Sequence, residues 1–179
     1  MTSTIVPSKE KIHRSLVNDY KKQLRKYILT SRFNNQTWTE NSHYRNRNTQ
    51  VGCIYCAPDP ITQIIPTDSI LFILEMNNET NSIIGIGMVR NHPIFNKYHV
   101  YENGNYNRYV YAGKIRIDRT EMTEEENKIM QVFDILCFSG NRHMKRGQGL
   151  KSFPTDMLYR CSKRLDLVQF INDMFKKRL

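Results

Sequence analysis

The stretch IIPTDSILFILEMNNETNSIIGIGMVRNHP, residues 64–93, decides how the chain is organised. It holds two apolar runs, residues 70–76 and 83–89, on either side of the polar segment NNETNS. Two such runs around a turn predict a β-hairpin whose strands are buried on both faces or close into a small barrel. Glycine at alternate positions, Gly85 and Gly87, indicates a tightly curved strand or a close backbone approach.

The charge of the chain indicates which classes of partner it can bind. The 179 residues carry a formal net charge of +10, with a pI near 9.5. This balance favours a polyanionic partner, nucleic acid first and an acidic membrane surface second, although a basic protein without such a partner also fits. No apolar run is long enough to span a bilayer, and the first residues show no secretory signal. We therefore expect an intracellular protein, in the cytoplasm or nucleus, without a membrane partner.

We expect one domain over residues 1–179, in three parts. Residues 1–25 predict a helix capped by Ser8. The basic face of this helix contacts either an anionic surface or, as in most such helices, solvent. Residues 26–119 hold the predicted strands, and residues 120–179 form a helical C-terminal extension. The abundance of Asn, Ile, Tyr and Lys is typical of AT-rich genomes, such as those of large viruses or parasites.

The polar segment SRFNNQTWTENSHYRNRNTQ, residues 31–50, carries the only tryptophan, Trp38. Aromatic side chains interleaved with arginine and asparagine are what base stacking and phosphate contact require. The alternative is that Trp38 fills the edge of the core, because a sole tryptophan is commonly a core residue. Both interpretations treat the surrounding residues as a loop.

The cysteines are consistent with an intracellular protein that has no metal site. The pair Cys53 and Cys56 has the spacing of half a zinc site or of a redox pair, but Cys137 and Cys161 are isolated and lack metal-ligand spacing. We expect no metal and no cofactor. The pair belongs to a predicted strand, residues 51–56, and the segment with Pro58 that follows terminates this strand.

Cations cluster in the second half of the chain. Residues 108–117 alternate as one strand that carries Lys114 and Arg116 on its outer face. A helix begins after the Thr123 cap with Glu126 at its third position, a capping box. The loop that follows, residues 140–154, combines three glycines with five residues suited to phosphate contact: Arg142, His143, Lys145, Arg146 and Lys151. It lacks the spacing of a P-loop, which excludes an NTPase, and a plain basic surface loop is the alternative.

Three segments resemble the PUA-like superfamily, and within it the YTH and EVE domains that read modified bases. They are KYILTS at 26–31, VGCIYCAP at 51–58 and DSILFILEMNNETNSIIGIGMV at 68–89. The resemblance implies an α+β fold: a small, strongly curved β-barrel flanked by helices, with a pocket for one base flipped from a single strand.

The resemblance also implies a set of pocket residues. Tyr55 stands where the family has a cage tryptophan, and Gly52, Cys53 and Cys56 would line the same wall. Trp38 would supply the second aromatic residue. The residues from Thr120 onward have no counterpart in the family.

The sequence thus leaves three functions open. The first is a nucleic-acid-binding module, for single-stranded RNA rather than DNA, that reads a base in an aromatic pocket and holds the backbone with its cations. The second is a nucleotide or RNA hydrolase, as in ASCH-type relatives, with His143 or Cys53 beside a carboxylate such as Glu75. The third is a protein that coats nucleic acid by charge alone.

Overall fold

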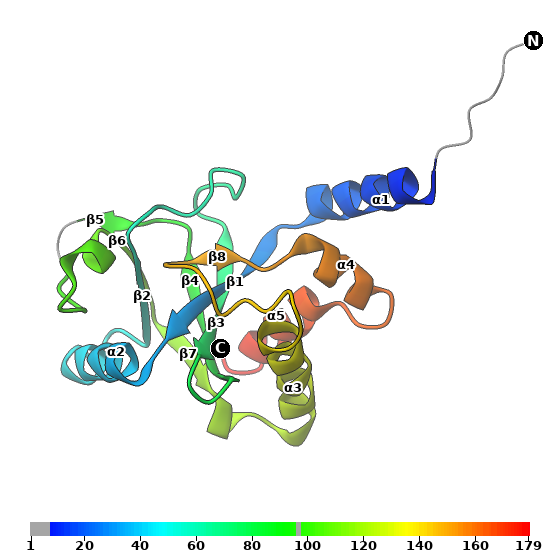
Figure 1. Cartoon of the computed structure of the whole chain (residues 1–179). Coiled ribbons are helices and arrows are strands. Elements are labelled where there is room, and N and C mark those ends of the chain that lie inside the picture. The colour runs from blue at the N-terminus through cyan, green and yellow to red at the C-terminus, as the bar shows by residue number, and fades with distance from the viewer. Residues whose placement is uncertain (1–7, 96–97) are drawn as a thin grey trace, which may run out of the picture.

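The computed structural model describes residues 8–95 and 98–179 of the chain. The described part is an α+β structure with two open β-sheets (Figure 1). In chain order its elements are α1 (Lys9–Gln23), β1 (Lys26–Phe33), α2 (Asn35–Arg47), β2 (Cys53–Ala57), β3 (Ile70–Asn77), β4 (Ser82–Arg90), β5 (Ile94–Phe95), the 3₁₀ helix η1 (Gly104–Asn107), β6 (Tyr109–Gly113), β7 (Ile115–Asp118), η2 (Arg119–Glu121), α3 (Glu124–Phe138), β8 (Lys151–Ser152), α4 (Thr155–Ser162) and α5 (Leu167–Lys176).

The larger sheet has five strands in the order β7-β4-β3-β1-β8. The predicted hairpin is confirmed as β3 and β4, which pair antiparallel. β1 pairs parallel with β3, so the chain must cross over between them through α2 and β2. The smaller sheet is antiparallel throughout, in the order β2-β6-β5.

Side chains of β3 alternate between two cores. Phe72, Leu74 and Met76 pack with residues of α3, α4 and α5, whereas Leu71 and Ile73 pack with residues of the smaller sheet. The hairpin is therefore buried on both faces, because helices cover one face of the larger sheet and a second sheet covers the other (Figure 1). The continuous apolar run of β3 is what such double burial requires.

The strongly curved PUA-like β-barrel that we expected is not present. The larger sheet ends in β7 at one edge and β8 at the other, and within the described residues no strand pairing joins these edges. The physical reason lies in the layers on either side. Each apolar face of the hairpin is covered by another layer, so the sheet buries its side chains without closing on itself.

Two further segments differ from the sequence-based expectations. Residues 31–50 contain the helix α2, which begins at the N-cap Asn34 and has a capping box with Thr37. Residues 108–117 form two strands in different sheets, β6 and β7, rather than one. The break falls at Lys114, directly after Gly113, where a Cβ would lie 2.1 Å from the Met88 carbonyl oxygen.

The C-terminal helices follow their sequence signals more closely. The capping box of Thr123 and Glu126 is present at the start of α3, and α4 and α5 lie within the predicted helical extension. α1 is capped by Ser8 as expected. It extends away from the body of the molecule (Figure 1), and its Ile12 and Leu16 are exposed.

Substitution of Gly87 by alanine is expected to destabilise the fold by about 1–3 kcal/mol, the usual cost of overpacking a core. A Cβ at Gly87 would lie 1.9 Å from the hydroxyl oxygen of Tyr55, which is fully buried. The matched control is Gly104→Ala, because a Cβ there meets no atom within 4 Å. Urea unfolding measures both variants. Equal stability of the two would contradict this account of the sheet packing.

Candidate binding pocket

A pocket of about 360 Å³ opens at the end of β1. Four segments form its walls: residues 31–34 at the end of β1, the first turns of α2, residues 101–106 around η1, and residues 147–149 of the loop after α3. Cys56 of β2 and Asn78 of the β3–β4 turn complete the lining. The parallel pairing of β1 with β3 brings the start of α2 and the turn of the hairpin to the same end of the sheet.

The lining combines aromatic rings with side-chain amides. Tyr101 and Tyr106 contact each other edge to face, with ring centroids 6.4 Å apart, and Phe33 lies on the β1 side. Tyr101 is buried, and its hydroxyl accepts a hydrogen bond from Nδ2 of Asn41 at 3.0 Å. The amides that line the pocket belong to Asn34, Gln36, Asn78, Asn103 and Gln148.

The loop of residues 140–154 reaches the pocket through its glycines. Gly147 and Gly149 adopt positive φ angles of 112° and 66°. A Cβ at Gly149 would lie 2.8 Å from Cβ of Ala57, so only glycine lets the loop lie against the end of β2. The Cβ position of Gly147 is 3.8 Å from Cε of Lys151 and 3.9 Å from Cζ of Arg32, which places both cations beside this turn of the loop.

Arg32 is a partly buried arginine without a counter-charge. Its Nε donates a hydrogen bond to the Met144 carbonyl, and its Nη1 is buried without a partner. Within the described residues no carboxylate pairs with it. Burial lowers the pKa of the Arg32 guanidinium, since removal from water disfavours the charged form. The group remains protonated at neutral pH, so it presents an uncompensated positive charge to the pocket.

The N-terminus of α2 contributes little free hydrogen-bonding capacity. The backbone N–H of Asn35 donates to Oε1 of Glu79 at 2.9 Å, and that of Thr37 donates to Oδ1 of Asn34 at 2.8 Å. Glu79 therefore already provides the negative charge that the helix dipole favours at this end. The charged residues that line the pocket itself are Arg32 and Glu40, and the loop cations lie outside this lining.

Of the residues expected from the sequence, Cys56 lines the pocket and Lys151 lies beside it. His143 and Lys145 are half-buried in the same loop, and Arg142 and Arg146 are exposed there. Sequence reasoning missed the pocket residues Asn34, Tyr101 and Tyr106. The pattern Asn34-x-x-Thr37 is an N-cap signal that marks the start of α2, but nothing local indicates that residues 101–106 reach this site.

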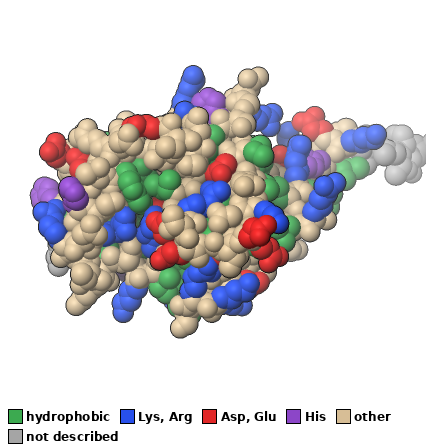
Figure 2. All heavy atoms as spheres, turned by 90° about the horizontal axis from the view of Figure 1, so that it is seen from below, with side chains coloured by type: hydrophobic (Ala, Val, Ile, Leu, Met, Phe, Trp, Pro, Cys, Tyr) green, Lys and Arg blue, Asp and Glu red, His purple; other side chains and the backbone are tan. Residues whose placement is uncertain are grey.

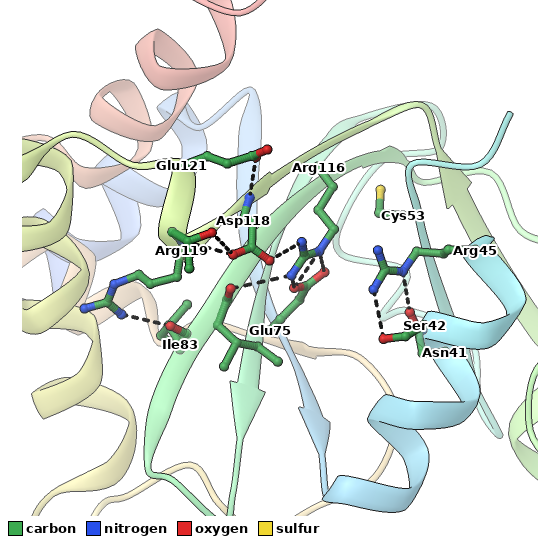
Figure 3. A network of polar contacts seen from close by, with 12 residues as sticks. Asn41, Ser42, Arg45, Cys53, Glu75, Ile83, Arg116, Asp118, Arg119 and Glu121 are labelled. Atoms are coloured by element: carbon green, nitrogen blue, oxygen red, sulfur yellow. Dashed lines mark hydrogen bonds and ion pairs between the residues drawn. The ribbon is translucent and has the colours of Figure 1, made fainter. Parts of the chain in front are cut away.

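Neither Tyr55 nor Arg116 lines the pocket. Arg116 belongs to a network with Glu75 and Asp118 (Figure 3). Tyr55 is 1% exposed and donates from its hydroxyl to Oε1 of Glu75 at 2.7 Å. Arg116 donates to both oxygens of Glu75 and, through Nη1, to Oδ2 of Asp118 at 2.7 Å. Since the Tyr55 ring is enclosed, it offers no face to a base, and the cage implied by the family resemblance is not formed around it.

The other expected wall residues also make contacts within the fold. The guanidinium carbons of Arg45 and Arg116 each lie 5.1 Å from the Trp38 ring centroid, so this ring packs against protein cations. A Cβ at Gly52 would lie 2.2 Å from the carbonyl oxygen of Lys114, a close backbone approach. The Lys114 side chain lines a separate groove beside β4.

The residues named for a hydrolase are not arranged for catalysis. Cys53 is buried, and burial raises the pKa of its thiol to about 12, so the nucleophilic thiolate is scarce at neutral pH. Glu75 is bound to Arg116 and Tyr55, and His143 lies in the loop after α3. Within residues 8–95 and 98–179, no group of three His, Cys, Asp or Glu side chains is placed to hold a metal ion.

Comparison of the chain with protein-family models, with curated proteins and with solved structures finds no match. Among the described helices, none has the length and apolar character needed to cross a membrane. The function is therefore argued from the site itself.

Thiol labelling of the native protein at neutral pH is expected to modify Cys161 and to spare Cys53, Cys56 and Cys137. Those three side chains are buried and Cys161 is partly exposed. Mass spectrometry of peptides after alkylation, with and without urea, measures the extent to which each cysteine is modified. Rapid labelling of Cys53 in the native protein would contradict its enclosed position and would favour a nucleophilic role.

Proposed function

We propose that this protein binds single-stranded nucleic acid, RNA in the first place, and takes one unstacked base into the pocket at the end of β1. The observation that carries the proposal is the pocket itself. Its volume of about 360 Å³ falls at the lower end of the range of small-ligand sites. It joins the partly exposed ring of Tyr106, which can stack on a base, to amides, which read base edges.

Cations at the rim support contact with the phosphate backbone. The loop that contributes Gly147 and Gly149 also carries Arg142, Lys145, Arg146 and Lys151. Lysine and arginine that neutralise phosphates release bound counterions, so affinity should fall as salt rises. The formal net charge of +10 agrees with a polyanionic partner.

Pocket binding favours single strands over duplexes. A base must leave its stack to enter, which costs a few kcal/mol in a duplex and little in a single strand. Binding by charge alone would show no such preference. On the face shown in Figure 2, Lys and Arg side chains alternate with Asp and Glu. This face is therefore not a continuous basic surface.

Replacing Tyr106 by alanine is expected to weaken binding to single-stranded RNA by about 1–3 kcal/mol, the usual contribution of stacking to one base. Tyr106 is partly exposed and lines the pocket. The matched control is Tyr98→Ala, because Tyr98 is also partly exposed and contacts Tyr44 edge to face outside the pocket. Fluorescence anisotropy over a salt series measures both variants.

The same titrations use a single-stranded RNA, an RNA duplex and a DNA duplex of equal length. The proposal expects the single strand to bind most tightly and the Tyr106→Ala variant to keep the salt dependence of the wild type, since the ring contacts no phosphate. Equal binding to all three nucleic acids, unchanged by Tyr106→Ala, would leave only a charge-driven interaction. Absence of binding at moderate salt would overturn the proposal.

A further inference from the structure

Unsatisfied polar atoms are concentrated beside the pocket. Among the described residues, four buried side-chain atoms lack a hydrogen-bond partner: Nη1 of Arg32, Oδ1 of Asn78, Nδ1 of His143 and the hydroxyl of Tyr20. The first two belong to residues that line the pocket, and His143 lies in the loop that forms its wall. Buried polar groups are nearly always paired in native proteins, so such a concentration points to a missing ligand.

Arg32 and Asn78 are neighbours that hold the same loop. The backbone N–H of Asn78 donates to the Phe33 carbonyl at 2.9 Å, which places the two residues at the same end of the sheet. Nε of Arg32 donates to the Met144 carbonyl, and Nδ2 of Asn78 donates to the next carbonyl, that of Lys145, at 3.0 Å.

These two bonds decide what remains available to a ligand. The Nη hydrogens of Arg32 can only donate, and they have no partner within the described chain. Because Nδ2 of Asn78 is engaged by a carbonyl, its Oδ1 is left as an acceptor. Two residues of the pocket wall thus hold a charged donor and a neutral acceptor, both buried and without a partner.

We propose that the pocket selects bases that carry a keto oxygen next to a ring N–H, namely uracil and guanine, over cytosine and adenine. This inference rests on the proposed function and names the class of base that the site reads. The keto oxygen would accept from Arg32, and the ring N–H would donate to Asn78 Oδ1. Cytosine and adenine present the reverse order, an amino group next to an unprotonated ring nitrogen, which sets donor against donor and acceptor against acceptor.

A phosphate is the other group that an unpaired arginine attracts. A fully ionised phosphate offers only acceptors, however, so it would leave Oδ1 of Asn78 buried and unpaired. The combination of a donor and an acceptor therefore favours a base edge. Nη1 and Oδ1 are shielded from solvent, so part of the pocket wall must move before a base can reach both atoms.

The decisive experiment uses ligand pairs that differ mainly at this edge. Single-stranded RNAs of equal length and labelling contain uridine against cytidine, and inosine against adenosine, since inosine carries the keto edge of guanine without its 2-amino group. Anisotropy titrations with the wild-type protein are expected to show about 5- to 150-fold tighter binding of the keto member of each pair, the range that a good arginine–base contact supplies. This comparison needs no variant and so does not depend on the folding of one.

Arg32→Met then tests the assignment to this residue, with Arg45→Met as the matched control. Arg45 is also partly buried, but it binds Asn41 and Ser42 and does not line the pocket. Both variants lose one positive charge. Arg32→Met is expected to lose most of the preference and to keep only the part that Asn78 supplies, whereas Arg45→Met is expected to keep the preference of the wild type.

The outcomes separate this inference from the proposed function. Tight binding of all four RNAs without a keto preference would overturn the base selection and leave the nucleic-acid-binding proposal intact. Failure to bind any of them would overturn both. If Arg32→Met weakens all four equally and lowers the salt slope by about one, Arg32 contacts a phosphate, and the base selection is again overturned.

Discussion

The carboxylate of Glu75, buried at the centre of the larger sheet, is the constraint on which the rest of the fold depends. It is 1% exposed, and it accepts hydrogen bonds from Arg116 of β7 (Figure 3). It also accepts one from the Tyr55 hydroxyl of the smaller sheet. A buried charge is tolerated only when it is paired and its lone pairs are satisfied. This one group therefore fixes the register of β7 and the position of the smaller sheet against the larger one.

The two glycines of β4 leave the space that the side chains of this network occupy. A Cβ at Gly85 would lie 2.6 Å from Oε2 of Glu75, and one at Gly87 would lie 1.9 Å from the Tyr55 hydroxyl. The alternation of glycine and apolar residues in β4 thus reflects close approach by side chains from neighbouring strands. The same packing encloses Tyr55, and the pocket forms instead where β1 ends and α2 begins.

Two partly buried arginines of this protein differ in how their charges are compensated. Arg116 is surrounded by carboxylates and lies over the Trp38 ring, so its charge is fully compensated. Arg32 has a single backbone carbonyl as its partner and no carboxylate within the described chain. An isolated buried charge lowers stability, and its persistence beside a pocket is best explained by a ligand that completes it.

The sequence by itself determined the features that depend on neighbours along the chain. The hairpin of β3 and β4, the Ser8 cap of α1 and the capping box of α3 follow from local patterns of polarity and hydrogen bonding. Only the tertiary structure decided the parallel pairing of β1 with β3, the division of residues 108–117 between two sheets, the burial of Tyr55 and the pocket around Arg32. These features join segments far apart in the chain, and no local pattern records which distant residues will meet.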